Sequence, residues 1–318
     1  MTTEPLELLT VGRISVDIYA NEAGVGFDGD QTFAKSIGGS PTNVAIAAAR
    51  LGHRSAVVTK VGAEPFGDYV RRRLVEFGVD TRFVGTHPTL RTPLAFAAMD
   101  PPEDPQLIFY REPMAPDATI ELSDVDLDVV RHVPIFWMSA SALAVEPSRS
   151  TSQTMLEARA GATHTVLDLD YRPMFWDDEA VARVTIGAAV EQCTIAVGNR
   201  TECDIAVGSS DPAEAAHRLL DRGVELAIIK QGGDGVLVAW PGGSAVVKPT
   251  PVNVVCGLGA GDAFGGALCH GLLSGWDPVQ MVTAANTAGA LVASRLLCSD
   301  AMPSLDELNA ILERSNAD

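Results

Sequence analysis

Strands and helices alternate regularly over the second half of this 318-residue chain. Between residues 133 and 230, short apolar runs alternate with stretches of helical periodicity, and polar turns separate them. Such alternation predicts a mostly parallel sheet covered by helices on both faces, and ligands of these α/β folds gather at the carboxyl ends of the strands. The expected strands here are 133–138, 163–169, 195–197 and 225–230, and the expected helices are 147–159 and 211–222.

The first half of the chain is less regular. Residues 92–99 and 106–112 resemble two strands joined by a proline-rich loop, and neither has a helical partner in the sequence. We therefore expect a small sheet that projects from the main body. The other expected elements are strands 6–12, 13–19, 32–37, 54–62, 244–247 and 252–255 and helices from 38 to about 51, 65–77, 260–273, 278–297 and 304–314.

Composition narrows the class of protein. The formal net charge of −18 argues against nucleic-acid binding. No apolar run reaches the roughly 20 residues of a membrane-spanning helix. Five cysteines are scattered without a CxxC pair, which is typical of reduced thiols in a cytoplasmic protein. We expect a cytoplasmic enzyme that binds neither nucleic acid nor a membrane.

The stretch Gly257–Asp262 leads from a β-rich run into a helix of small residues. Gly259 and Gly261 let the backbone approach a ligand closely, and the first amides of a helix lack intrahelical acceptors. Together with the helix dipole, these amides favour an anion such as a phosphoryl group. Asp262 beside such a site could deprotonate an attacking hydroxyl, or it could merely complement the helix dipole.

A second glycine-rich turn, Gly38–Asn43, opens the helix that ends near Leu51. Ser40 is expected to cap this helix, with Pro41 at its first position. Capping does not explain the glycine pair or Asn43, which can both donate and accept hydrogen bonds. Asp17, on an otherwise apolar strand face, is either a structural hydrogen-bonding group or a ligand contact.

Polar residues also stand at the predicted strand ends between the two turns. Asn199 and Glu202 are three residues apart, so they could hold a hydrated Mg²⁺ or form a capping box. Lys230 and the glycines that follow it suit a nucleotide phosphate and ribose, although Gly232–Gly235 is also an ordinary hairpin turn.

Several enzyme classes are excluded by missing motifs. The chain has no Walker A loop, no G-x-G-x-x-G after its first strand, no zinc-ligand spacing and no G-x-S-x-G elbow. These absences remove hydride transfer, zinc-dependent hydrolysis and serine-ester chemistry as first choices.

The two turns and the motif between them occur in the order found in one family. The chain resembles ribokinase-like (PfkB-type) carbohydrate kinases over essentially its whole length. This resemblance implies a single kinase domain over residues 1–318, a three-layer α/β sandwich with a mostly parallel central sheet and a small β lid formed by about residues 13–37 and 82–112. The motifs that carry it are Gly38-Gly39-Ser40-Pro41-Thr42-Asn43, Asn199-x-x-Glu202 and Gly259-Ala260-Gly261-Asp262.

The resemblance also implies ATP and Mg²⁺ as cofactors and a role for each motif. Asp262 would be the catalytic base, beside an anion hole formed by Gly259, Ala260 and Gly261. Substrate hydroxyls would be bound by Asp17, Gly38, Gly39 and Asn43. The nucleotide would lie against Lys230, Gly232, Gly235 and Asn286, and the metal near Asn199 and Glu202. Lid strands of this family often pair, which implies a homodimer.

A finer resemblance concerns the substrate. Residues around Gly12, Phe33, Tyr110 and Asp168–Trp176 are most similar to 5-dehydro-2-deoxygluconate kinases of myo-inositol catabolism, and next to 2-dehydro-3-deoxygluconate kinases. Arg111 and Arg172 could grip the carboxylate of such a sugar acid, with Tyr110 beside them. Alternatively, Arg172 pairs with Asp168 or Asp170. Two hypotheses compete with a sugar-acid kinase: the chain is another sugar or nucleoside kinase of this family, or it is a non-catalytic sugar sensor of the same fold.

One stretch departs from the family pattern. Cys256-Gly257-Leu258 stands where the family commonly has Asp-Thr-Thr. Without that carboxylate, use of a monovalent cation is left open, as are the phosphorylated hydroxyl and the nucleotide preference.

Overall fold

Nine strands form one large sheet in the computed structural model, which describes residues 5–315. All neighbouring pairs from β11 to β5 are parallel, whereas β12 is antiparallel to β11 and to β13. In spatial order the strands are β13 (Gly243–Val247), β12 (Val236–Trp240), β11 (Leu226–Lys230), β10 (Ile195–Asn199), β9 (Thr165–Asp168), β8 (Ile135–Ser139), β1 (Leu8–Val11), β4 (Ser55–Gly62) and β5 (Val84–His87).

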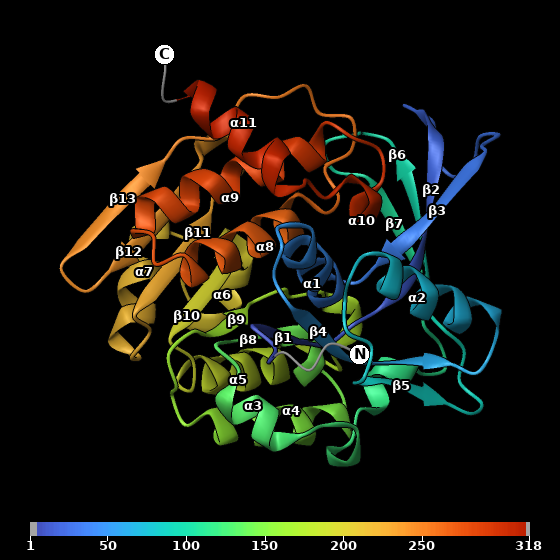
Figure 1. Cartoon of the computed structure of the whole chain (residues 1–318), viewed down its shortest axis with the longest axis horizontal. Coiled ribbons are helices and arrows are strands. Elements are labelled where there is room, and N and C mark those ends of the chain that lie inside the picture. The colour runs from blue at the N-terminus through green and yellow to red at the C-terminus, as the bar shows by residue number, and fades with distance from the viewer. Residues whose placement is uncertain (1–4, 316–318) are drawn as a thin grey trace.

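Helices cover both faces of this sheet, which gives the three layers seen in Figure 1. Successive strand residues point to opposite faces, so Leu8 belongs to one apolar core and Leu9 to the other. The first core is closed by α1 (Ser40–Arg50), α2 (Pro65–Glu76), α8 (Ala260–Leu273), α9 (Pro278–Ala293), α10 (Cys298–Ala301) and α11 (Leu305–Ser315). The second is closed by α3 (Leu127–His132), α4 (Ser148–Arg159), α5 (Glu179–Val190), α6 (Arg200–Val207) and α7 (Pro212–Asp221).

A separate small sheet projects from one end of the molecule (Figure 1). Its strands lie in the order β3 (Phe33–Gly38), β2 (Ser15–Ala23), β6 (Leu94–Met99) and β7 (Gln106–Tyr110). Val16, Ile37 and Ala97 of this sheet are buried in the same core as α1 and α8. The small sheet is therefore packed against the layer that carries both glycine-rich turns.

The α/β architecture with a mostly parallel sheet and a small additional sheet is confirmed, but three details of the prediction were wrong. The second lid segment was predicted to begin at residue 82, whereas Val84–His87 pairs with β4 at the edge of the large sheet. Residues 252–255 are not a strand. The amides of Val255 and Cys256 instead donate to the carbonyl of Ala293 at the end of α9. Strand β12 and helices α3, α5, α6 and α10 were not among the predicted elements.

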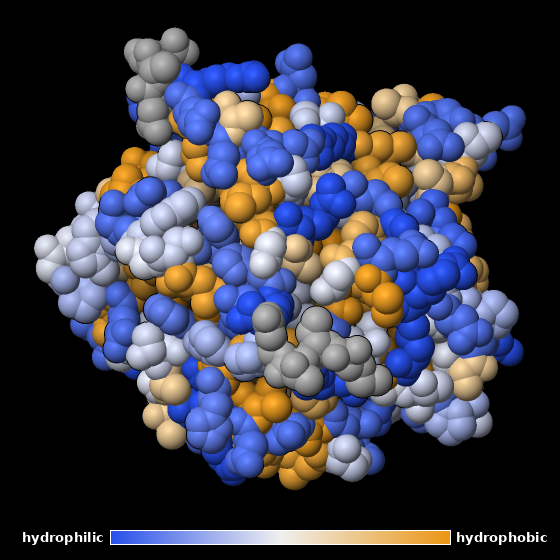
Figure 2. Space-filling view, viewed as in Figure 1, coloured by the Kyte–Doolittle hydropathy of each residue, from blue (hydrophilic) through white to orange (hydrophobic). Residues whose placement is uncertain are grey.

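The surface mixes polar and apolar side chains. On the face drawn in Figure 2, hydrophobic areas are interrupted by hydrophilic residues. Within residues 5–315, no helix is long and apolar enough to cross a membrane.

Candidate active site

A cavity of about 290 Å³ lies between the carboxyl ends of the parallel strands and the small sheet. Register explains why predicted residues meet there. Asp168 and Lys230 end parallel strands on either side of β10, whose last residue, Asn199, caps the helix that carries Glu202. The cavity is lined by Arg13, Ser15, Asp17, Tyr19, Gly39, Ser40, Asn43, Ala95, Glu103, Asp104, Pro105, Leu107, Phe109, Asp168, Asp170, Arg172, Glu202, Lys230, Gly257, Leu258, Gly259, Gly261, Asp262 and Cys298.

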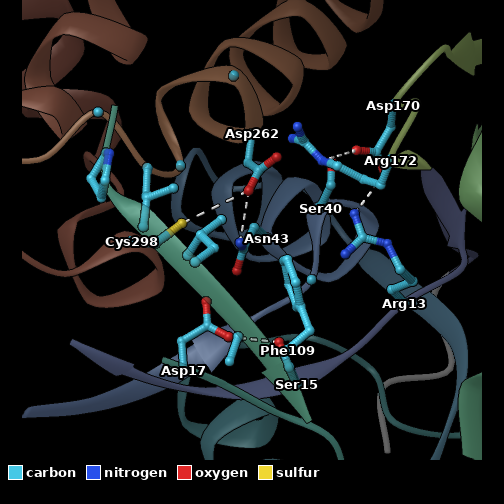
Figure 3. Close-up of a pocket in the computed structure, with 18 of the residues that line it drawn as sticks. Arg13, Ser15, Asp17, Ser40, Asn43, Phe109, Asp170, Arg172, Asp262 and Cys298 are labelled. Atoms are coloured by element: carbon cyan, nitrogen blue, oxygen red, sulfur yellow. Dashed lines mark hydrogen bonds and ion pairs between the residues drawn. The ribbon is translucent and has the colours of Figure 1, made fainter. Parts of the chain in front are cut away.

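Asp262 stands in the first turn of α8 and faces the helix of the other glycine-rich turn. Asn43 Nδ2 donates to Asp262 Oδ2 at 2.7 Å, and Cys298 Sγ lies 3.8 Å from the same oxygen (Figure 3). Burial raises the pKa of Asp262, while the hydrogen bond from Asn43 opposes that rise. The carboxylate is thus a stronger base than an exposed aspartate, and Asn43 holds its orientation.

The backbone before Asp262 is fixed by Gly259. This residue caps α8 with φ +81°, and a Cβ atom there would lie 2.1 Å from Cys298 Sγ. The amides of Ala260 and Gly261 have no acceptor among the described residues, so their N–H groups remain available to an anion. Lys230 Nζ lies 3.7 Å from where a Cβ atom on Gly261 would stand, which adds a cation to the same place.

The other glycine-rich turn is built differently from the prediction. Gly39, not Ser40, caps α1, with φ +98° and no side-chain capping bond. A Cβ atom at Gly39 would lie 2.3 Å from the Arg13 carbonyl oxygen, so only glycine fits the turn. Ser40 is then free to donate to Asp168 Oδ2 at 3.2 Å across the cavity. Asn43 is held from behind by Ser299 Oγ, which donates to its Oδ1 at 2.9 Å.

Asp17 lies on β2, on the opposite side of the cavity. Ser15 Oγ donates to its Oδ1 at 2.6 Å, and the Tyr19 hydroxyl lies 3.3 Å from Oδ2. Gly38 makes room for this carboxylate, since a Cβ atom there would be 2.0 Å from both of its oxygens. Burial raises the pKa of Asp17 to about 6, although the hydrogen bonds from Ser15 and Tyr19 oppose the rise.

This raised pKa predicts a pH-dependent cost in stability. The folded state binds the Asp17 proton more tightly than the unfolded chain, so the cost is absent below pH 3.8 and complete above about pH 6. We expect Asp17→Asn to stabilise the protein by on the order of 1 kcal/mol at pH 8, with the gain vanishing near pH 4. Urea unfolding across this range measures it. The exposed Asp306→Asn is the control, and an equal gain at both pH values would contradict the prediction.

Charged groups at the ends of β9, β10 and β11 form the remaining wall. Burial raises the pKa of Asp168, opposed by Lys230. Burial lowers the pKa of Lys230, but Asp168, Glu202 and Asp262 outweigh it, so the pKa is raised overall and the amine stays protonated. Asn199 and Glu202 form a reciprocal capping box, with bonds of 2.9 and 2.7 Å. Glu202 Oε1 has no hydrogen-bond partner among residues 5–315, and Glu202 lines the cavity.

The hairpin loop between β6 and β7 covers the α8 turn. Gly257 N donates to the Pro102 carbonyl at 2.8 Å, and Glu103, Asp104 and Pro105 line the cavity. The small sheet therefore reaches across the site to the turn that carries Asp262.

Comparison with known proteins identifies the architecture. The family model described as "pfkB family carbohydrate kinase" matches residues 6–305 of this chain. The chain belongs to the pfkB carbohydrate kinase family. It is 33% identical to a 5-dehydro-2-deoxygluconokinase from Geobacillus thermodenitrificans, over 99% of this chain and 95% of that protein.

Solved structures of sugar kinases have the same fold as this chain. The chain is similar to an E. coli protein given as a ribokinase II in complex with ATP and Mg²⁺, at 26% identity and a TM-score of 0.87, covering 97% and 99% of the two chains. It is also similar to a fructokinase from Vibrio cholerae in a fructose-, ADP- and calcium-bound form, at 27% identity and a TM-score of 0.83, covering 96% and 99%.

Three residues expected near the nucleotide lie outside the cavity. Gly232 and Gly235 belong to the turn before β12, and Asn286 lies on α9. Gly235 and Asn286 both contact the segment after β13. Gly235 packs against Val247 and Lys248, and Asn286 Nδ2 donates to the Lys248 carbonyl at 3.1 Å. This pfkB kinase therefore brings Gly235 and Asn286, but not Gly232 or Lys230, to the segment that leads from β13 toward α8.

The two arginines proposed for the carboxylate differ in position. Arg172 lines the cavity, and its Nε lies 3.3 Å from Asp170 Oδ1. Arg111 lines a neighbouring cavity instead and makes a two-pronged ion pair with the buried Asp117. Tyr110 is exposed on β7, with its ring 5.5 Å from that of Phe96.

Sequence reasoning did not single out four residues of the cavity wall as site residues. Arg13 directly follows the Gly12 at the end of β1, so the rule about strand ends could have found it. Asp170 and Phe109 stand beside predicted residues. Cys298 carries no sequence signal, because it reaches Asp262 only through the packing of α10.

Proposed function

We propose that this chain transfers a phosphoryl group from ATP to a hydroxyl of a sugar acid, with 5-dehydro-2-deoxygluconate of myo-inositol catabolism as the substrate. The observation that carries the proposal is Asp262, a carboxylate with a raised pKa held beside the unpaired amides of Ala260 and Gly261. The 33% identity to a 5-dehydro-2-deoxygluconokinase over nearly the full length supports the choice of substrate.

The residues fit a magnesium–nucleotide complex. Lys230 and the amides at the start of α8 offer positive charge to phosphate oxygens, and Glu202 Oε1 could bind a hydrated cation, since Mg²⁺ usually keeps several waters. When bound, this complex supplies the phosphoryl group and neutralises part of its charge.

The cavity residues then have separate roles in the phosphoryl transfer. Asp17 and Asn43 orient the substrate hydroxyls, and Asp262 accepts the proton of the hydroxyl that attacks. The amides of Gly259, Ala260 and Gly261, with Lys230, stabilise the negative charge of the transferring group. Closure of the β6–β7 loop over Gly257 keeps water away from that group. We place the whole reaction in one kinase domain in the cytoplasm, where thiols such as the five unpaired cysteines stay reduced.

The test is Mg²⁺-dependent ADP release with a panel of substrates. The panel contains 5-dehydro-2-deoxygluconate, 2-dehydro-3-deoxygluconate, fructose and a nucleoside. We expect the highest kcat/KM with the first. A preference for fructose or the nucleoside would contradict the sugar-acid assignment, and binding without ADP release would indicate a sensor rather than an enzyme.

We also propose that two copies pair through their small sheets. Large apolar side chains of this sheet are exposed, among them Phe33 on β3 and Leu107 and Ile108 on β7.

Sedimentation tests this pairing. We expect the wild type to sediment at twice the chain mass of 33.4 kDa and Ile108→Asp to sediment at the chain mass, because a charge in an apolar interface is costly. The control is Val184→Asp, an equally drastic change at an exposed position of α5. A monomeric wild type at micromolar concentration would contradict the proposal.

A further inference from the structure

Two arginines of the cavity wall share one buried carboxylate. Arg13 Nη2 lies 2.6 Å from Asp170 Oδ2, and Arg172 Nε lies 3.3 Å from Asp170 Oδ1. Asp170 is only 3% exposed. Figure 3 shows both guanidinium groups beside Asp170, on the side of the cavity away from Cys298. We call Arg13, Asp170 and Arg172 the arginine cradle.

The cradle is held rigidly. Ser139 Oγ and Ser141 Oγ lie 3.3 and 3.1 Å from Asp170 Oδ2, and Arg13 Nε donates to Ser141 Oγ at 2.9 Å. The Arg13 guanidinium also lies over the Phe175 ring, 4.9 Å from its centroid. Because these contacts fix the guanidinium plane before any ligand arrives, little side-chain entropy remains to be lost on binding.

The cradle holds more guanidinium N–H donors than Asp170 accepts. Two guanidinium groups face one carboxylate, and Arg13 and Arg172 lower the pKa of Asp170 against the effect of burial, so Asp170 stays ionised. Within the described part of the chain, Nη1 of Arg13 has no hydrogen-bond partner, and the Arg172 side chain is 47% exposed. The cradle therefore keeps unused N–H donors on two cationic side chains that line the cavity.

Arg111 is paired with a different carboxylate, which lies in the neighbouring cavity. Both of its terminal nitrogens are engaged with Asp117, whose other partner is the backbone amide of Ile14. Its guanidinium lies over the Phe175 ring, 5.0 Å from the centroid, but it lines the neighbouring cavity. Arg13 thus occupies the position in the substrate cavity that was predicted for Arg111.

We propose that Arg13 and Arg172 bind the carboxylate of the sugar acid and that Asp170 is the positioning residue that holds both. This inference rests on the proposed function and adds the residues that would distinguish an acid from a neutral sugar. A neutral sugar would leave the unused N–H donors of the cradle without an anionic acceptor, so the preference for an acid arises from charge-assisted bonds that only a carboxylate can accept.

The test compares KM and kcat for 5-dehydro-2-deoxygluconate and for fructose, a neutral ketose. We expect Arg13→Gln and Arg172→Gln each to raise KM for the acid about 10- to 100-fold, with kcat changed much less and KM for fructose unchanged. Asp170→Asn should raise the same KM. In the double variant Arg13→Gln/Asp170→Asn the increase should be smaller than the product of the single effects, since both changes disable one cradle.

Arg183→Gln is the matched control, because Arg183 is ion-paired on the surface of α5 with Asp204 and Glu179. Since Arg13 is buried, Arg13→Gln could fail to fold. The half-exposed Arg172 and the charge-balanced double variant then carry the test.

The outcomes separate the two proposals. If the wild type phosphorylates no sugar acid, the proposed function fails. If it does so and the Arg13 and Arg172 variants keep the wild-type KM for the acid, the cradle assignment alone is overturned. A larger KM increase for Arg111→Gln than for Arg13→Gln would return the role to Arg111.

Discussion

Replacing Asp262 by Asn is expected to lower kcat by about 10²–10⁴-fold while leaving KM for the sugar acid within a few-fold of the wild type. Asparagine has nearly the same shape and can still accept the hydrogen bond from Asn43 Nδ2, so the cavity should keep its form. It cannot take a proton from the substrate hydroxyl. The loss should therefore fall on the chemical step, and steady-state ADP release measures it.

An aspartate at the start of helix α11 supplies the control for Asp262→Asn. Asp306 is an exposed carboxylate in the first turn of α11, where it merely complements the helix dipole, and Asp306→Asn should leave kcat unchanged. Wild-type kcat/KM should also fall on the acid side with an apparent pKa above 3.8, because burial raises the pKa of Asp262. Near-normal turnover of Asp262→Asn would return this residue to the dipole-complementing role.

Strand–helix alternation made the site partly predictable. Parallel strands end at one edge of a sheet, so residues that follow successive strands meet in space even when they are far apart in sequence. Asp168, Asn199 and Lys230 meet for this reason. The helix that follows the Gly257–Asp262 turn begins and ends at the predicted residues, Ala260 and Leu273, because its small apolar residues are bounded by glycine on one side and by Ser274-Gly275 on the other.

What could not be predicted depends on partners distant in sequence. Residues 252–255 have the composition of a strand, yet no strand within residues 5–315 pairs with them, and the amides of Val255 and Cys256 bond to the end of α9. Arg111 looked available because its partner, Asp117, lies in a short 3-10 segment without a sequence signal. Strand β5 joins the large sheet only through the return of the chain from α2, which pattern alone does not reveal.

The same cavity also shows a conflict between stability and function. Burial raises the pKa of Asp17, Asp168 and Asp262, so each carboxylate is costly when ionised at neutral pH. The positive charges of Lys230 and the arginine cradle offset only part of this cost. A site that must receive phosphate, a carboxylate and a proton in one place retains these charges at the expense of stability.

The largest structural effect is expected from Gly259→Ala. A Cβ atom at this position would stand 2.1 Å from Cys298 Sγ and 2.9 Å from Cys298 Cβ, in a backbone conformation of φ +81° that side chains rarely adopt. The α8 turn would have to move, and with it the amides of Ala260 and Gly261. Because a displacement of about 1 Å can cost about 100-fold in rate, we expect kcat to fall by roughly that factor and stability by about 1–3 kcal/mol.

Gly275→Ala separates the clash from the backbone strain. Gly275 lies just beyond the other end of α8 with φ +67°, and no atom lies within 4 Å of the place where its Cβ atom would stand. This change should therefore cost about 1 kcal/mol in stability and leave kcat unaltered. Adding Cys298→Gly to Gly259→Ala removes the colliding side chain and should restore part of the lost kcat. If the double variant is no faster than Gly259→Ala, the collision with Cys298 is not what displaces the turn, and strain at φ +81° alone must account for the loss.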